Sequence, residues 1–404
     1  MSANNTFQSL NALFKQVYAD KIQNLIPDGV KLYKMIEFQQ KTKLGNSYNQ
    51  PVILGHEHGV TFAASDDDAF ALNAAVAGAV KNASIRGNPV VLRSVLGYKA
   101  ASSAIGGDQK AFMDATKFLV ANMLRSITKK LEIELLYGQV GYGKVDSVSG
   151  TQLTIAAAEW ASGIWSGAEG MPVDIYSEDL TTLRVSTTVS SVDLDAKKVT
   201  VADATGVQAD DVIYHKGAKG NEFAGIHKII TNTGSLFDIS ASQYSLWKGN
   251  EYSAGSASLS LAKIERAIAL AVAKGLDSDV TVLVSPKTWA DLLVEQAALR
   301  KYDSSYSSAQ VEAGAKSIKF YGQNGLVAIE PTIYCKEGYA YVLAMDTMMR
   351  VGSTDVTFKR PAMEGDFFRD LEANAGYELR AYTDQALFCD APGKNVLISN
   401  IVNS

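Results

Sequence analysis

Residues 45–107 constrain the fold of this 404-residue chain more than any other segment. They hold two extended runs, 47–54 and 89–98, separated by a polar turn and the nearly uncharged stretch 69–80. Loops beyond about 12–15 residues are uncommon inside compact domains, and a lone two-stranded ribbon is marginally stable in water. The segment therefore predicts an extended β-hairpin loop that lies on a neighbouring subunit, where its backbone edges and apolar side chains find partners.

The strongest helical pattern covers residues 108–137. Asp108 is a suitable N-cap and Gly138 a suitable C-cap. At 1.5 Å per residue such a helix is roughly 45 Å long, which predicts a spine laid across a sheet. Its apolar residues recur at spacings of three and four and form one stripe: Phe112, Ala115, Leu119, Met123, Ile127, Leu131 and Leu135.

Residues 141–255 change to short strands separated by Asp, Gly, Asn and Ser, a texture typical of an all-β barrel or sandwich. The segment also carries the acidic excess of the chain. It is therefore predicted to be an inserted, surface-exposed β domain. Its expected strands are 151–157, 173–176, 187–194, 198–201 and 212–215.

The remainder of the chain returns to mixed α/β patterns. A helix is expected at 260–274, and a second through residue 299, with Ser285 as N-cap and Pro286 in its first turn. The alternating runs near the C-terminus predict strands of the sheet that carries the spine helix. The expected strands of the whole region are 280–284, 326–329, 339–343, 351–358, 377–388 and 395–401.

Residues 1–44 have too few apolar residues for a core and read as an arm. A short amphipathic helix is expected from Leu10 to Leu25, and a strand-like run at 30–38. The arm is mildly basic. It is either solvated or in contact with DNA or an acidic scaffold partner.

Charge and cysteine content narrow the class of protein. The net charge is −5 and the sequence pI about 5.5, whereas proteins that grip nucleic acid usually carry a basic face. Cys335 and Cys389 lie far apart and are expected to be reduced thiols. The first residues lack the pattern of a secretory signal, and no uncharged apolar stretch approaches the ~18 residues that span a bilayer. We therefore expect a protein made in a cytoplasm, without contact to a membrane.

The search for chemistry gives no catalytic, cofactor-binding or metal-binding residues, and we expect a protein that is not an enzyme. His56 and His58 could bind a metal with Asp66, Asp67 or Asp68, but no third ligand stands at a defined spacing, so a solvated turn is the better interpretation. The glycines of 138–143 follow a helix and precede strands, which is the reverse of a dinucleotide-binding loop. A junction between domains is the better interpretation.

The order of these elements resembles the major capsid proteins of tailed bacteriophages, whose fold encapsulins share. Residues 283–292 resemble the strand-to-helix step of that family's axial domain. Residues 346–353, followed by Thr357 and Phe358, resemble its return to the peripheral domain, and residues 377–388 resemble its closing strand.

The resemblance implies an α+β capsid fold with five parts. Residues 1–44 would be the N-terminal arm and 45–107 the extended loop. Residues 108–140 and 356–404 would form the peripheral domain with its spine helix, and 256–355 the axial domain. Residues 141–255 depart from the minimal family pattern as a β-barrel-like insertion, expected on the outer surface of the shell.

The resemblance also implies function and partners. Many copies would form the pentamers and hexamers of an icosahedral phage head assembled in the host cytoplasm; an encapsulin-type compartment shell is the alternative. A separate scaffolding protein and a portal are implied partners, a decoration protein is a further one, and packaged DNA would be contacted weakly and non-specifically. Some relatives crosslink through a Lys in the loop and an Asn near the C-terminus; Lys99 and Asn400 stand in such places but in no recognisable motif.

Overall fold

The computed structural model describes residues 29–39, 47–66, 69–98, 115–300, 318–359, 368–372 and 374–404. The longest helix in this part of the chain is α3 (Ala115–Tyr137), which belongs to the predicted spine. Its 23 residues span about 35 Å at 1.5 Å per residue. The expected N-cap Asp108 lies outside the described residues. Four residues of the predicted stripe are buried, which confirms the apolar face: Met123, Ile127, Leu131 and Leu135.

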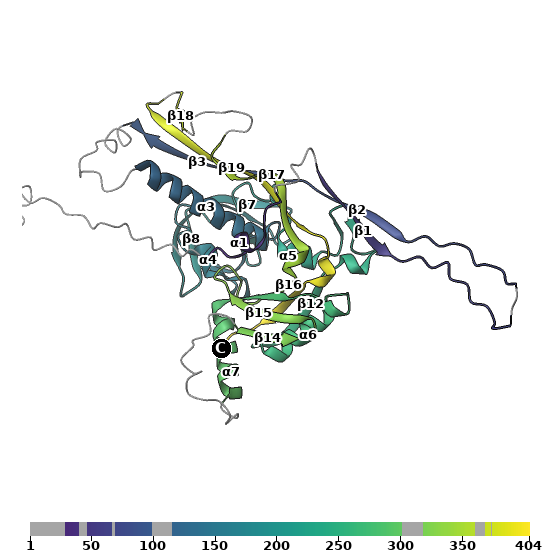
Figure 1. Ribbon diagram of the computed structural model, residues 1–404. Helices are drawn as coiled ribbons and strands as arrows, with labels where there is room; N and C mark the ends of the chain where they lie inside the picture. Colours follow the sequence, from purple (N-terminus) through teal and green to yellow (C-terminus); the bar gives the residue numbers. More distant parts are fainter. Residues whose placement is uncertain are drawn as a thin grey trace, which may run out of the picture.

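The spine helix packs on a four-stranded antiparallel sheet (Figure 1). The central strand, β19 (Gly376–Cys389), pairs on one side with β3 (Asn88–Gly97). On the other side it pairs with β17 (Met348–Thr357) and β18 (Phe368–Asp370). Met123 and Ile127 cluster with Leu379 and Ala381 of β19. The runs at 351–358 and 377–388 are thus confirmed as strands of the sheet that carries the helix.

The two extended runs of the predicted hairpin do not pair with each other. Instead, β1 (Tyr48–Gly55) pairs antiparallel with β2 (Ala79–Ile85), while the second run, β3, joins β19. Local patterns identify a strand but not its partner, and β19 lies far away in the sequence. The two-stranded ribbon therefore ends at Ile85, and Figure 1 shows it reaching away from both large sheets.

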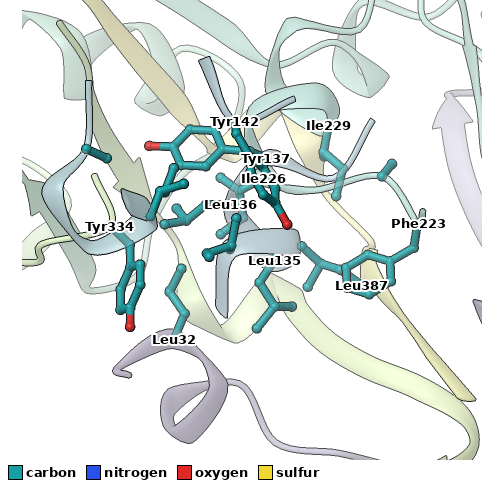
Figure 2. Close-up of a cluster of buried hydrophobic side chains, with 14 of the residues drawn as sticks. Leu32, Leu135, Leu136, Tyr137, Tyr142, Phe223, Ile226, Ile229, Tyr334 and Leu387 are labelled. Atoms are coloured by element: carbon teal, nitrogen blue, oxygen red, sulfur yellow. The ribbon is translucent and has the colours of Figure 1, made fainter. Parts of the chain in front are cut away.

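The C-terminal end of α3 differs in detail from the prediction. The Gly138 N–H donates to the carbonyl of Glu134 at 2.8 Å, so helical hydrogen bonding continues through Gly138. The left-handed residue is Gln139, with φ 66°. Glycine is required at 138 for another reason, because a Cβ there would overlap the carbonyl oxygen of Phe223. Figure 2 shows Leu135, Leu136 and Tyr137 meeting Phe223, Ile226 and Ile229 at this junction.

The predicted β-rich segment contains a closed barrel with strand order β4-β5-β8-β7-β6-β9. Closure leaves no exposed sheet edge, which short strands need for stability. Its interior holds mainly aliphatic side chains, among them Val145, Leu153, Ile175 and Val199. The strands are β4 (Gly143–Ser149), β5 (Gln152–Ile155), β6 (Pro172–Tyr176), β7 (Leu183–Asp193), β8 (Lys198–Val201) and β9 (Val212–His215).

The barrel strands end at His215, well before the expected boundary at 255. The chain then forms α5 (Ile226–Thr231), the short pair β10 (Ser235–Leu236) and β11 (Ile239–Ser240), and β12 (Asn250–Ala257). β12 pairs in parallel with β20 (Val396–Ile401) in another sheet. The short helix α4 (Ser162–Trp165) lies between β5 and β6.

A six-stranded mixed sheet with order β12-β20-β16-β13-β15-β14 forms the second large layer. β20 was expected in the sheet of the spine helix and instead pairs with β12 and β16. Two helices accompany this sheet: α6 (Leu261–Val272), capped by Ser260, and α7 (Pro286–Arg300), with Ser285 accepting from the Thr288 N–H. The other strands are β13 (Val280–Val284), β14 (Ile318–Gly322), β15 (Gly325–Pro331) and β16 (Ala340–Leu343).

The strand-like run expected at 30–38 is wrong for most of its length. Residues Leu32–Met35 form a one-turn helix, α1, and only Phe38 makes a β-bridge, to Arg350. The cause is remote in sequence: the Glu132 carboxylate accepts from the N–H groups of Lys31, Leu32 and Tyr33 and so caps the turn. The amphipathic helix expected before Pro27 lies outside the described residues.

Candidate functional site

The ribbon consists of β1, β2 and the described residues between them, 48–66 and 69–85. It exposes large apolar side chains along its length. Phe62 is 91% exposed, Leu72 80% and Ile53 71%, fractions that a folded chain rarely leaves in water. Val60, Phe70, Val76 and Val80 are exposed as well. An exposed apolar surface of this extent marks an interaction site. The described part of the chain leaves these side chains exposed, which makes the ribbon the candidate contact surface of the subunit.

The outer half of the ribbon is joined by few contacts. The ladder of β1 and β2 ends at the Gly55–Ala79 pair. Beyond it, the His58 N–H donates to the Val76 carbonyl at 3.0 Å, and Asn73 bridges to Thr61 and Val60 at 2.8 and 2.9 Å. The backbone here therefore keeps donors and acceptors that a neighbouring strand can use.

The base of the ribbon, by contrast, is fixed to the body of the subunit. Ala83 and Ile85 of β2 are buried, and the Ser84 N–H donates to the Phe237 carbonyl at 3.0 Å. The ring of Phe388 lies 5.3 Å from the rings of both Tyr48 and Phe237, between centroids. The ribbon is thus anchored to the subunit at its base, while its apolar outer part is exposed.

The segment 29–39 is held against the spine helix and the sheet by side-chain contacts. Besides the three hydrogen bonds to Glu132, the Arg350 guanidinium holds it by donating to the Ile36 carbonyl at 2.8 Å and stacking on the Tyr33 ring at 4.0 Å. Burial raises the pKa of Glu132, and the three N–H groups oppose that shift. Spine helix and sheet therefore grip the N-terminal segment from two sides.

A buried ion pair joins the barrel rim to the six-stranded sheet. Lys336 is 1% exposed, and its Nζ lies 2.6 Å from Glu159 and 3.2 Å from the Gly141 carbonyl. Tyr339 donates to the same carboxylate at 2.7 Å, and the Lys336 ammonium lies 4.4 Å from the Tyr137 ring centre. Sequence patterns gave no sign of this cluster, because a lone Lys and Glu resemble surface residues.

A second group of buried charges lies at the end of the spine helix. Glu134 on α3 and Glu222 after the barrel are both buried. Lys130 points its Nζ into the same region without a hydrogen-bond partner, 4.4 Å from the Tyr142 ring centre. These residues line a cavity of about 660 Å³. This site was also missed by sequence reasoning.

The residues considered for chemistry form no site within the part of the chain that the structure describes. His56 and His58 are exposed, and the described residues contain no group of His, Cys, Asp or Glu placed to hold a metal. Asp67, Asp68 and Lys99 lie outside the described residues, while Asn400 donates to Ser253 at 3.0 Å. The 138–143 glycines join α3 to β4, as expected of a junction.

The two cysteines are free thiols, as expected. Cys335 and Cys389 are both buried, and burial raises the pKa of Cys389 to about 12. They are therefore unreactive at neutral pH. None of the described helices combines the length and the apolar character that crossing a membrane demands.

Comparisons with known proteins place the fold. No family model and no curated protein sequence matches the chain. Among solved structures, the capsid asymmetric unit of cyanophage A-1(L) is similar with a TM-score of 0.60 and 13% identity, covering 98% of this chain and 99% of that one.

Two further capsids are similar at the level of the fold. The capsid of the native GTA particle has a TM-score of 0.53 and 8% identity, covering 99% of this chain and 100% of its own. The capsid of cyanophage P-SCSP1u has a TM-score of 0.50 and 9% identity, covering 100% and 97%. The chain therefore has the α+β fold of these phage and GTA capsid subunits, as the sequence resemblance predicted.

Proposed function

We propose that the protein is the structural subunit of an icosahedral phage head, assembling into pentamers and hexamers that enclose the genome. The observation that carries the proposal is the ribbon, whose large apolar side chains are left exposed by the part of the chain that the structure describes. The capsid fold supports it, because subunits of such shells meet many copies of themselves. The proposed role is mechanical and uses no catalysis.

Assembly of this kind needs only modest contacts. Burying one exposed Phe or Leu is worth roughly 1.5–3 kcal/mol, and ordering a ribbon costs part of that gain. Each copy both gives a ribbon and receives one in a closed ring, so every subunit is held from two sides. Repetition around a shell then yields a stable particle from weak pairwise contacts.

The parts of the subunit receive separate roles in this proposal. The spine helix with β3, β17, β18 and β19 is the peripheral domain, and the six-stranded sheet with α6 and α7 is the axial domain around capsomer centres. The strand pairing changes four of the expected assignments: β3 and β17 move to the peripheral domain, and β12 and β20 move to the axial domain. The barrel is the insertion, which we assign to the outer surface.

Partners follow from the same role. A separate scaffolding protein and a portal would complete head assembly, and a decoration protein could bind the outer face. With a net charge of −5, the subunit would contact packaged DNA weakly and non-specifically. Particles holding nuclease-resistant DNA favour the phage head, and particles holding a protein cargo favour the encapsulin alternative.

Hydrogen exchange on the ribbon tests the proposal directly. We expect amides in residues 69–80 to exchange rapidly in unassembled subunits and to be protected in assembled particles, because a neighbour then covers them. Amides of α6, whose Ile264 and Ala267 are buried in the subunit core, should be protected in both states and serve as the control. Equal protection of residues 69–80 in both states would contradict the proposal.

A further inference from the structure

The end of the spine helix is tied to the chain leaving the barrel by reciprocal hydrogen bonds. The Glu134 carboxylate accepts from the Phe223 N–H at 3.3 Å, and the Glu222 carboxylate accepts from the Gln139 N–H at 3.1 Å. The Gln139 amide donates to the Glu222 carbonyl at 3.0 Å, and the Gly225 N–H donates to the Gly138 carbonyl at 3.0 Å. Each carboxylate thus holds the backbone of the opposite element.

The two carboxyl groups are buried with a shortage of positive charge. The Lys130 charge acts on both, yet among the described residues its Nζ has no hydrogen-bond partner and lies 4.4 Å from the Tyr142 ring centre. Lys129, one residue earlier, is engaged elsewhere, because it donates to the Ser166 carbonyl at 2.6 Å.

The surrounding elements bring further titratable groups to the cavity. Arg125 of α3 and Glu169, between α4 and β6, line it and are exposed, as is Lys216 after β9. His215 at the end of β9 also lines it, with a pKa lowered to about 4 by burial and by the Lys130 charge. Asp174 on β6 is engaged by Ser186 and by the Gly217 N–H. At neutral pH, His215 is therefore uncharged and does not compensate the two carboxylates.

The cost of burial shows in the proton affinities of the three groups. Burial, with a contribution from the Glu222 charge, raises the pKa of Glu134 to about 8. Burial also raises the pKa of Glu222. Burial lowers the pKa of Lys130 to about 7. The junction therefore favours the neutral forms of all three side chains.

We propose that this junction is a proton-operated clamp between the spine helix and the β barrel. While a proton resides on the Glu134–Glu222 pair, the clamp is closed and the reciprocal hydrogen bonds hold. When both carboxyl groups ionise, their repulsion and hydration favour release of residues 222–225 from the helix end, which frees the barrel to shift on the spine. The clamp is a property of one subunit and does not depend on shell assembly.

The direction of the pH effect follows from linkage. Glu134 binds its proton more tightly in the closed form than in the open form, where its pKa returns toward the ordinary value near 4.3. Closure is therefore fully favoured below that value and weakens as pH rises toward 8. Lys130 acts oppositely, but only above pH 7, because below that pH it is protonated in both forms.

Amide exchange at the clamp tests the proposal in the full-length, unassembled chain. The amides of Gln139, Phe223 and Gly225 should lose protection between pH 5 and 7, after correction for intrinsic exchange rates, by up to about tenfold per pH unit. Glu134→Gln keeps the shape and the acceptor oxygen but removes the titration, so the loss should shrink. The double variant with Glu222→Gln should show a flat profile.

Two comparisons separate the clamp from general pH effects. Glu169→Gln removes an exposed carboxylate from the same cavity and should leave the wild-type profile unchanged. Carbon-13 resonances of the glutamate carboxyl groups, assigned with the variants, should show Glu134 titrating well above the ordinary range. Equal pH profiles in the wild type and the double variant, or an ordinary titration of Glu134, would overturn the proposal.

Discussion

Replacement of Lys336 by methionine is expected to lower the free energy of unfolding by about 3 kcal/mol. The substitution keeps the apolar stem but removes the ammonium that lies 2.6 Å from Glu159 and 3.2 Å from the Gly141 carbonyl. Removing one partner of a buried pair costs roughly 3–5 kcal/mol, because the other charge stays buried and uncompensated. The lower end applies here, since Tyr339 still donates to Glu159 and that side chain is 14% exposed.

Two variants isolate the cause of the loss in urea or thermal unfolding. Lys336→Met with Glu159→Gln removes both charges and should recover most of the lost stability. Lys287→Met makes the same chemical change at an exposed pair, 3.2 Å from Glu337, and should cost less than about 1 kcal/mol. A loss of the same size at both lysines would contradict the assignment of Lys336 and Glu159 as a buried ion pair that stabilises the contact between barrel and sheet.

The Lys336–Glu159 pair also makes the stability of the fold depend on pH. Burial alone would raise the pKa of Glu159, but the Lys336 charge and the hydrogen bonds from Lys336 and Tyr339 lower it to about 2. A depressed pKa gives stability that is present above the unfolded value near 4.3 and lost as pH falls toward 2. Lys336→Met should therefore remove this part of the acid sensitivity.

Replacement of Glu132 by alanine is expected to release the 29–39 segment from the spine helix. The change leaves the N–H groups of Lys31, Leu32 and Tyr33 without their acceptor in a buried place. Each buried N–H group without an acceptor costs about 1–3 kcal/mol, so three of them cost roughly 3 kcal/mol or more. Release of the segment into water, where the N–H groups find acceptors, avoids that cost. Amide exchange should therefore rise throughout α1, while the cores of both large sheets stay protected.

Matched variants distinguish the cap from a general effect on the helix. Glu132→Gln retains an acceptor oxygen and should release the segment only partly. Ser126→Ala changes an exposed position of the same helix and should leave α1 protected. Unchanged protection of α1 in Glu132→Ala would show that Arg350 alone holds the segment.

The sequence predicted those elements whose signal is local. Strands β8, β9 and β13 match their expected bounds, because alternating or buried apolar runs stand between clear turn residues. The helix α7 follows from Ser285 and Pro286, which cap and start it. The spine helix follows from its stripe, and the capsid fold from the order of the elements.

The pairing of strands that lie far apart in the sequence could not be predicted, because local patterns carry no information about the partner strand. β3 and β20 were recognised as strands, yet their sheets depend on partners far away in the sequence. The turn at Leu32 is helical because Glu132 caps it from another element. Lys336 and Glu134 were missed because nothing local separates a buried charged residue from a solvated one.

Electron microscopy of the purified protein, produced alone or together with the proposed scaffolding protein, tests directly whether the subunit builds an icosahedral shell. We expect closed icosahedral particles in which the ribbon of each subunit, with its exposed Phe62 and Leu72, lies against a neighbouring copy. Open tubes, or subunits that stay monomeric in every condition with the ribbon still exposed, would contradict it.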